Sequence, residues 1–391
     1  MSCIKFTDDE SQDLNLAQDS RIQITKFIHA SDIHLGSHQY ENTSRSDDYI
    51  KTFQEILTLA IENKVDFIIL SGDVFTSLEM LPGKLIEIIK MIKRFIKATE
   101  NKVPIIAIEG NHDIRRFSRG MRFDHRDQSW LKLCADLDLI ILLDADFQDP
   151  SGEIFKWYDH YCHEGGKLQV NNIVIYGTRY LGEQPISHLS KIRKGIKKEK
   201  GKFNILLQHF GVEGQMKNVP GIKLEMLNPL HHRVDYLALG HFHKQFILDD
   251  WVFNPGSTEA VCSIDFSFNR GVFLVEITGD KVFSKKIKKI KLKNRSHIWC
   301  SLRFRFQFKK KEEFYSYLIK HVKRALRSDG DNDNEERPVL LLKLSGIKPF
   351  LNQKINQREI QKILSKHLPI TGAKVYLKFN HYRNTIIKYL Q

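Results

Sequence analysis

The sequence predicts an α/β fold in two parts, a layered core of strands and helices followed by a smaller α/β domain. Two observations support the core: apolar segments of strand length alternate with amphipathic helical segments up to residue 143, and the middle of the chain is rich in strands. The third observation is a change of pattern after Arg295. From there the chain reads as a βαβαβ unit of about 95 residues, the size of a small domain.

The first part of the core alternates between strands and helices. Apolar strands are expected at 24–30, 65–70, 103–109 and 139–143, and helices at 45–63, 82–99 and 128–135. The first helix is expected to place Phe53, Ile56, Leu57, Ala60 and Ile61 on one face. Pro82 suits the first turn of the second helix, where no amide proton is needed.

The middle of the chain is expected to be mostly strand. Strands are predicted at 168–176, 203–208 and 236–239, followed by a hairpin formed by 271–277 and 281–292. Between the first two strands lies a helix-like stretch, 186–202, with seven basic residues from Lys191 onward and Glu199 as its acid. An exposed helix face and a contact to a phosphate backbone both explain this run.

The last part of the chain is expected to form the smaller domain. Strands are predicted at 297–308, 339–344 and 373–379, helices at 311–327 and 357–367, and a polar loop at 328–337. The proposed division is an acidic, flexible extension at 1–23, a main domain at 24–292 and the small domain at 293–391.

Composition excludes several classes of protein. Hydrophobic residues make up 41% and charged residues 28%, an ordinary balance for a globular protein. No apolar run approaches the roughly 20 residues that span a bilayer, and the acidic start does not resemble a signal peptide. The five cysteines are scattered without a Cys-x-x-Cys motif, which favours a reducing compartment and argues against a structural zinc or a disulfide framework.

The charge is unevenly distributed along the chain. Residues 281–391 contain 28 Lys and Arg against 8 Asp and Glu, a net charge of +20, so that the total of +14 leaves −6 for residues 1–280. A basic module on an acidic body suggests a polyanionic partner. Lysines that serve only to keep the protein surface hydrated would give the same net charge.

Residue types that bind metals or transfer protons follow five of the expected strands. The five segments are Asp32-Ile33-His34, Gly72-Asp73, Gly110-Asn111-His112-Asp113, Gln208-His209 and Gly240-His241-Phe242-His243. The carboxyl ends of strands in an open α/β sheet form a crevice where sites assemble. Residues two apart on an extended segment share a side, so Asp32 and His34 can face one point, as can His241 and His243.

These segments predict a site for two metal ions. Apart from His112, Asp113 and Gln208, they offer two carboxylates, one amide oxygen and four imidazoles, and no thiolate. That set is too large for one tetrahedral zinc and suits two divalent ions, with Mn²⁺ favoured and Mg²⁺, Fe²⁺ or Zn²⁺ as alternatives. Two ions roughly 3.5–4 Å apart can clamp the attacking and leaving oxygens of a phosphoester. Taken alone, each of these residues would have a structural explanation. Asp32 or Asp73, for example, could cap a turn or a helix.

The order of these motifs resembles that of the calcineurin-like metallophosphoesterases, over about residues 24–260. Three segments resemble the SbcD / Mre-eleven family of DNA double-strand-break repair nucleases within that superfamily. They are Asp32-Ile33-His34-Leu35-Gly36, Gly72-Asp73-Val74-Phe75 and Asn254-Pro255-Gly256-Ser257-Thr258-Glu259. The resemblance implies the metallophosphoesterase fold, a layered β-sandwich core flanked by helices, with a small C-terminal α/β capping domain that binds DNA.

The resemblance also implies roles for individual residues. Asp32, His34 and His243 would bind one ion, and Asp73 would bridge both. The ligands of the other ion would be Asn111, His209 and His241. His112 would stabilise the transition state and help to protonate the leaving oxygen, and Asp113 would orient that region.

The implied activity is Mn²⁺-dependent DNA cleavage, as a 3′-to-5′ exonuclease on duplex ends and an endonuclease on single-stranded or hairpin DNA. The implied partners are DNA, a second copy of the chain and an SbcC-type coiled-coil ABC ATPase, in the cytoplasm of a prokaryote or the nucleus of a eukaryote. Leu85–Ile96 and Asp127–Leu137 are the candidate dimer helices. The apolar stripe on the first of them also suits an intramolecular core.

Two features depart from the family pattern. Members often have a His, sometimes an Asp, three residues after the bridging aspartate, where this chain has Thr76. We therefore expect reduced exonuclease activity or a different partner for His112. Secondly, no helical hairpin of the kind that grips the ATPase is visible before Gln391. A truncated chain and an ATPase held by other surfaces are both consistent with this.

Two other functions fit parts of the sequence. The same metal chemistry serves a phosphatase or a cyclic-nucleotide phosphodiesterase, and the basic second domain is what favours DNA. The chain could also be mainly a DNA-end-binding scaffold with weak catalysis. The presence of all seven ligand positions and of His112 argues against that reading.

Overall fold

The computed structural model describes residues 24–41, 43–114, 129–183, 185–328, 336–350 and 353–379. Four expectations from the sequence lie wholly or partly outside this range. They are the acidic extension at 1–23, most of the loop at 328–337, the start of the helix around Asp127 and Gln128, and the end of the small domain at 380–391. Among the described residues no helix is long and apolar enough to cross a membrane.

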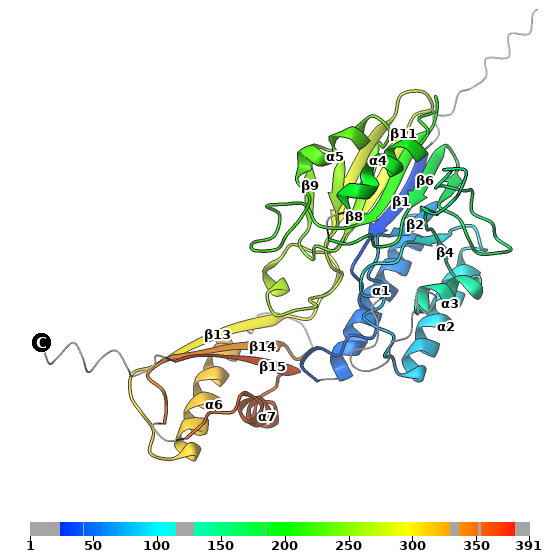
Figure 1. Ribbon diagram of the computed structural model, residues 1–391. Helices are drawn as coiled ribbons and strands as arrows, with labels where there is room; N and C mark the ends of the chain where they lie inside the picture. Colours follow the sequence, from blue (N-terminus) through cyan, green and yellow to red (C-terminus); the bar gives the residue numbers. More distant parts are fainter. Residues whose placement is uncertain are drawn as a thin grey trace, which may run out of the picture.

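Two six-stranded sheets form the main body of the molecule (Figure 1). The order of the first sheet is β12 (Ser284–Ile290), β11 (Val272–Thr278), β1 (Ile24–Ala30), β2 (Phe67–Leu70), β3 (Ile105–Ala107) and β4 (Ile141–Leu142). Its parallel strands β1 to β4 are linked by helices, as the alternating sequence pattern predicts.

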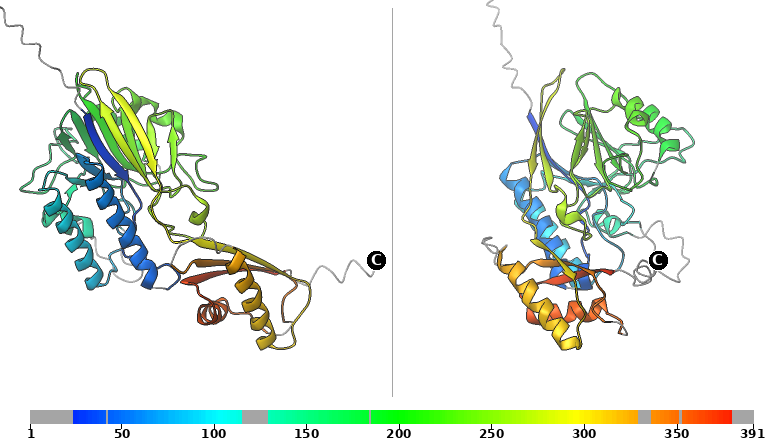
Figure 2. Two further views of the ribbon diagram at one scale, coloured as in Figure 1. Left: turned by 180° about the vertical axis from the view of Figure 1, so that it is seen from behind. Right: turned by 90° about the vertical axis from the view of Figure 1, so that its left-hand side faces the viewer.

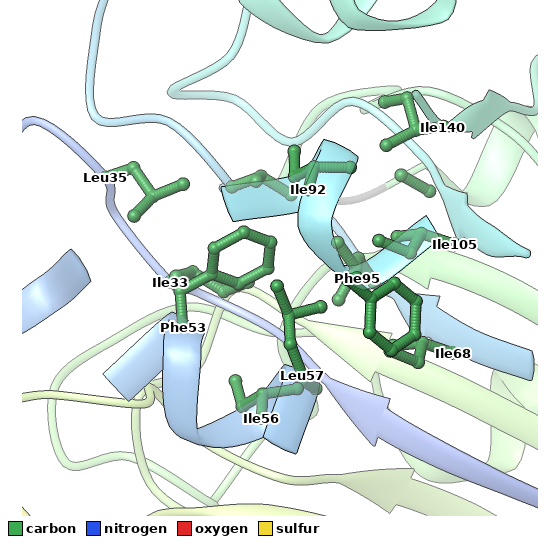
Figure 3. Packing of buried hydrophobic residues seen from close by; sticks show 14 of the residues in the cluster. Ile33, Leu35, Phe53, Ile56, Leu57, Ile68, Ile92, Phe95, Ile105 and Ile140 are labelled. Carbon is green, nitrogen blue, oxygen red and sulfur yellow. The ribbon is translucent and has the colours of Figure 1, made fainter. Parts of the chain in front are cut away.

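Three helices cover the outer face of this sheet: α1 (Thr43–Glu62), α2 (Pro82–Ala98) and α3 (Trp130–Asp136). Figure 3 shows how Phe53 and Leu57 of α1 and Phe95 of α2 pack over Ile68 and Ile105 of the sheet. The apolar stripe on α2 serves this core, since Ile88 and Ile92 are buried in it.

The order of the second sheet is β5 (Lys167–Val170), β6 (Ile173–Gly177), β7 (Phe203–His209), β8 (Tyr236–Gly240), β10 (Val252–Asn254) and β9 (Phe246–Leu248). Two helices, α4 (Ile186–Gly195) and α5 (Leu224–His231), bring Leu189, Ile192, Leu227 and Leu230 onto its outer face.

The inner faces of the two sheets share a dry core. Phe27 stacks on Phe67 within the first sheet, with ring centroids 4.9 Å apart, and Tyr236 stacks on Phe253 within the second at 4.0 Å. Phe27 also meets Tyr236 edge to face across the interface. The layers are therefore helix, sheet, sheet, helix, which confirms the predicted β-sandwich flanked by helices (Figure 2).

Several elements of the middle region differ from the prediction, and the short strands β9 and β10 were not expected. The single strand expected at 168–176 is a hairpin, β5 and β6, because Asn171 adopts a positive φ of 54° that turns the chain back. The helix expected to reach Lys202 ends at Gly195, where Ile196 becomes extended. Helix α5 was not expected, since Pro229 lies inside it.

A separate C-terminal unit projects from one end of the two-sheet core (Figures 1 and 2). Its parallel sheet is β13 (His297–Phe304), β14 (Val339–Gly346) and β15 (Gly372–Phe379), with α6 (Lys311–Ser328) and α7 (Gln357–His367) between successive strands. This is the βαβαβ unit that the sequence predicts. Both helices pack on the same face of the sheet.

A buried ionic network joins the unit to the core. Arg295, which directly precedes β13, donates from Nε to Oδ2 of Asp48 on α1 at 2.6 Å. The same carboxylate accepts from Nη1 of Arg45 at 2.6 Å, and Arg45 reaches Glu259 with its other nitrogen. All four charged groups are buried or nearly so. The network fixes the junction between the two parts of the chain.

Candidate metal centre

The five polar segments singled out in the sequence converge at one edge of the sandwich. They follow the carboxyl ends of β1, β2 and β3 in the first sheet and of β7 and β8 in the second. Asp32, His34, Asp73 and His241 all have positive φ, at 51°, 53°, 51° and 86°. This conformation is unusual for residues other than glycine and concentrates at functional sites.

Glycines make this close approach of loops possible. A Cβ atom on Gly110 would lie 2.2 Å from Oδ1 of Asp73, and one on Gly72 would lie 2.4 Å from Nδ1 of His209. Both positions therefore exclude every larger residue. The loops after β2 and β3 and the end of β7 touch at these two points.

One group of ligand-type side chains consists of Asp32, His34 and His243. Their donor atoms all lie within 4.8 Å of one another. Nε2 of His34 is buried and has no hydrogen-bond partner among the residues that the structure describes. A buried polar atom without a partner is costly, and a cation among these three side chains would remove that cost.

A second group centres on the amide oxygen of Asn111. This Oδ1 atom lies 3.1 Å from Nε2 of His209 and 3.0 Å from Nδ1 of His241. Asp73 lies between the two groups, with its Oδ2 atom 3.3 Å from Nε2 of His209 and 3.8 Å from Nε2 of His34. The structure thus brings together all seven residues that the sequence proposed as ligands.

These residues fit two divalent cations. The donor set consists of carboxylate, amide and imidazole atoms, as expected for Mn²⁺, Fe²⁺ or Zn²⁺. The carboxylate of Asp73 has room to serve both groups, and His34 offers an unpartnered nitrogen.

Burial and mutual repulsion keep two of the imidazoles neutral. Burial lowers the pKa of His34 well below its usual range, and burial together with nearby His209 lowers that of His241 to about 4. Burial would also lower the pKa of His209, but the charge of Asp73 outweighs it and raises the pKa to about 9. A cation bound by Asp73 and His209 would replace that proton, because only a neutral imidazole nitrogen can bind metal.

Asp265 and Ser71 hold two of the histidines in place, which the sequence did not reveal. Nδ1 of His243 lies 2.8 Å from Oδ2 of buried Asp265, in the short helical turn η2 (Asp265–Ser267). Nδ1 of His209 donates to the main-chain oxygen of Ser71 at 2.7 Å. Each contact leaves Nε2 for the metal centre, in the arrangement typical of ligating histidines. No sequence motif identifies Asp265 as a partner of a metal ligand.

His112 borders the metal centre. Its ring meets that of His34 edge to face at 4.8 Å, and its main-chain nitrogen donates to Oδ1 of Asp73 at 2.7 Å. Its Nδ1 atom lies 3.0 Å from the main-chain oxygen of Thr76. A carbonyl can only accept, so Nδ1 carries a proton and Nε2 remains for a substrate.

Asp113 lies beneath the loops and is buried. Its carboxylate accepts main-chain hydrogen bonds from Gly110 and Phe75, each at 2.8 Å, and from Val74 at 3.3 Å. It thereby ties the loop after β3 to the loop after β2. Asp113 thus holds these loops together, and the orienting role that the family resemblance implies for it stays a prediction.

Comparison with known proteins decides the family. The sequence profile of the calcineurin-like phosphoesterases matches residues 25–245, more than half of the chain. The chain belongs to this family. The matched range contains all seven ligand-type residues, His112 and Asp113.

Several curated relatives carry the name DNA double-strand break repair protein Mre11. The one from Archaeoglobus fulgidus is 30% identical over 245 residues, an alignment that covers 60% of this chain and 50% of that protein. The one from Sulfurisphaera tokodaii is 25% identical over 347 residues, covering 87% and 78%. The chain thus spans about half the length of the first relative. Among solved structures, a dimetal phosphatase from Danio rerio covers 68% of this chain and 97% of its own at 10% identity, with a TM-score of 0.42.

Proposed function

We propose that this phosphoesterase is a two-metal DNA nuclease of double-strand-break repair. Its activities would be a Mn²⁺-dependent 3′-to-5′ exonuclease on duplex ends and an endonuclease on single-stranded or hairpin DNA. The observation that carries the proposal is the convergence of seven ligand-type side chains beside His112. The Mre11 relatives and the basic C-terminal unit support DNA as the substrate.

Each group of side chains would hold one ion. Asp32, His34 and His243 would bind the first, with Asp73 shared between the two. The second ion would be bound by Asn111, His209 and His241. When bound, the ion pair would neutralise phosphate charge and supply a hydroxide nucleophile.

His112 would act on the phosphate from the side of the first group. Its Nδ1 atom contacts the carbonyl oxygen of Thr76, which would leave its Nε2 atom for the phosphate. In the protonated state this nitrogen can donate to a phosphate oxygen and then give its proton to the leaving oxygen. Asp113 would keep the loop in place by accepting hydrogen bonds from the main-chain nitrogens of Gly110 and Phe75.

The remaining parts of the proposal concern partners. The C-terminal unit would be the capping domain that grips DNA, since it belongs to the region with a net charge of +20. A homodimer is supported by exposed apolar side chains at Leu81, Ile86, Leu133 and Leu137, on and beside α2 and α3. An SbcC-type ATPase partner rests on the family resemblance alone.

A substrate panel tests this function. The protein is incubated with Mn²⁺ and, separately, with end-labelled duplex, hairpin DNA, single-stranded DNA, a cyclic nucleotide and a chromogenic phosphomonoester. We expect cleavage of the three DNA substrates to exceed turnover of the other two. Turnover of the phosphomonoester or the cyclic nucleotide without DNA cleavage would assign a different phosphoesterase activity.

His112→Asn is the control for this panel. The substitution should lower DNA cleavage by about 10²-fold or more, the usual contribution of a positioned acid. Cleavage that the variant leaves unaltered would come from a contaminant or from a mechanism without His112.

A further inference from the structure

The sheet of the C-terminal unit has one face covered by its helices and one face that is largely open, although Leu341 on that face is buried. Side chains alternate along a strand, so residues at 300, 302 and 304 of β13 lie under α6 and α7. The other face carries Trp299 and Arg303 of β13, Lys343 of β14, and Tyr376 and Lys378 of β15. In Figure 1 the two helices lie on one side of this sheet, and the two-sheet core lies on the opposite side.

A row of aromatic rings crosses from the core onto this open face. Phe266 of η2 is nearly parallel to Trp299, with ring centroids 6.1 Å apart and an interplanar angle of 5°. Trp299 in turn lies 5.8 Å from Tyr376. Although it has a ring on each side, Trp299 remains 47% exposed. Rings that served only to seal the junction would be buried, so much of this indole is available to a ligand.

The charges around the row are positive. Arg303, Lys343, Lys374 and Lys378 share the open face with the rings, and no residue of the three strands is acidic. A basic surface with aromatic rings set into it is the usual composition of a platform for unpaired nucleic acid. The cations follow the phosphates, and the bases stack on the rings.

The row begins at the metal centre. Phe266 follows Asp265, whose carboxylate contacts Nδ1 of His243. The hydroxyl of Tyr376 donates to Ser263 in the same loop, which joins the far end of the row to the core as well. A strand lying on the row would therefore pass near His243, one of the proposed metal ligands.

We propose that the open face of the C-terminal sheet binds single-stranded DNA, with bases stacked on Trp299 and Phe266 and phosphates beside the lysines. This inference rests on the proposed nuclease function and adds a subsite for the unpaired strand. An intact duplex cannot use the aromatic row, because its bases are stacked on each other. The row therefore selects for frayed ends, hairpin loops and single strands.

The test measures binding in the presence of a chelator, so that no cleavage takes place. The affinity of the full chain for a short oligothymidylate and for a blunt duplex is measured for the wild type, Trp299→Ala and Trp299→Phe. Trp157→Ala is the matched control, because Trp157 is 55% exposed and lies beside β5. Thermal melting of each variant verifies that it is folded.

We expect Trp299→Ala to lose about fivefold or more in affinity for the oligothymidylate, as for one stacked base. Its affinity for the duplex should change much less, and Trp299→Phe should retain most of the binding. Oligothymidylate should quench tryptophan fluorescence in the wild type and less in Trp299→Phe. Full affinity in Trp299→Ala, or equal losses for both DNA forms, would overturn the inference.

The result is separable from the proposed function. A protein that cleaves DNA with Mn²⁺, but whose affinity for single strands does not depend on Trp299, overturns this inference alone. A protein that shows the Trp299-dependent binding but cleaves no DNA overturns the nuclease function instead.

Discussion

Nδ1 of His112 donates to the main-chain carbonyl of Thr76 at 3.0 Å, while the hydroxyl of Thr76 turns away toward His34. The hydroxyl lies 3.0 Å from the main-chain oxygen of His34 and 3.4 Å from its Nδ1 atom. The partner of His112 is thus a neutral main-chain carbonyl and not the side chain that the family pattern led us to expect. Thr76 contacts both the proposed acid and a proposed metal ligand through different atoms.

Thr76→Ala separates these two contacts. The substitution keeps the carbonyl that holds His112 and removes the hydroxyl beside His34. We expect the cleavage rate at saturating Mn²⁺ to remain within about threefold of the wild type, while the Mn²⁺ concentration for half-maximal rate rises, because outer partners of a ligand support metal affinity. Thr76→Ser should restore the Mn²⁺ dependence. A large loss of rate at saturating Mn²⁺ would show that the hydroxyl supports His112 directly.

Asp265→Asn tests the support of His243. The carboxylate of Asp265 lies 2.8 Å from Nδ1 of His243 and also accepts from the main chain of Val261 and Cys262. Loss of its charge should weaken Mn²⁺ binding about 10–100-fold, the range seen for outer partners of ligating histidines. Isothermal titration with Mn²⁺ measures this directly. Asp280→Asn, at an exposed position, is the control and should bind Mn²⁺ as the wild type does.

Asp48→Ala tests the junction between the core and the C-terminal unit. Arg45 and Arg295 both depend on this carboxylate, and both guanidinium groups are nearly inaccessible to solvent. Removing one partner of a buried ion pair costs about 3–5 kcal/mol, since the remaining charges stay buried. Urea unfolding should show a loss of this size. Glu100→Gln removes the exposed partner of Lys102, away from this network, and should change the free energy of unfolding by less than about 1 kcal/mol. Equal effects of the two substitutions would contradict the account of the network.

DNA affinity should depend steeply on salt. The region from residue 281 onward carries a net charge of +20, and each phosphate that a lysine or arginine contacts releases counterions. If the C-terminal unit contacts several phosphates, the affinity for duplex DNA should fall by at least tenfold between about 50 and 200 mM salt. A DNA-binding titration in the presence of a metal chelator measures how the affinity depends on salt concentration, without cleavage of the DNA. An affinity that does not change over this range of salt concentration would exclude the C-terminal unit as the main DNA-binding surface.

The sequence predicted the parts of the fold and site that depend on local pattern. The ligand-type residues were visible because each follows an apolar strand, as Asp32 follows β1 and His241 follows β8. Asp265 was not visible, since only the tertiary fold places η2 against His243. The partner of His112 could not be foreseen either, because the contact uses a main-chain oxygen that every residue has.

The aromatic row shows a further limit of the same kind. Strand periodicity put Trp299 and Cys300 on opposite faces of β13. Which face the helices would cover, and which would stay open, depends on how α6 and α7 pack. The alignment of Phe266 with Trp299 joins residues from two parts of the chain that no local pattern connects.

The central claim is that two cations occupy the groups around Asp32 and Asn111, with Asp73 shared. Anomalous scattering from a crystal grown with Mn²⁺ tests it most directly. We expect two peaks, one within bonding distance of Asp32, His34 and His243, and the other within bonding distance of Asn111, His209 and His241. A single peak, or peaks that lie away from Asp73, would contradict it.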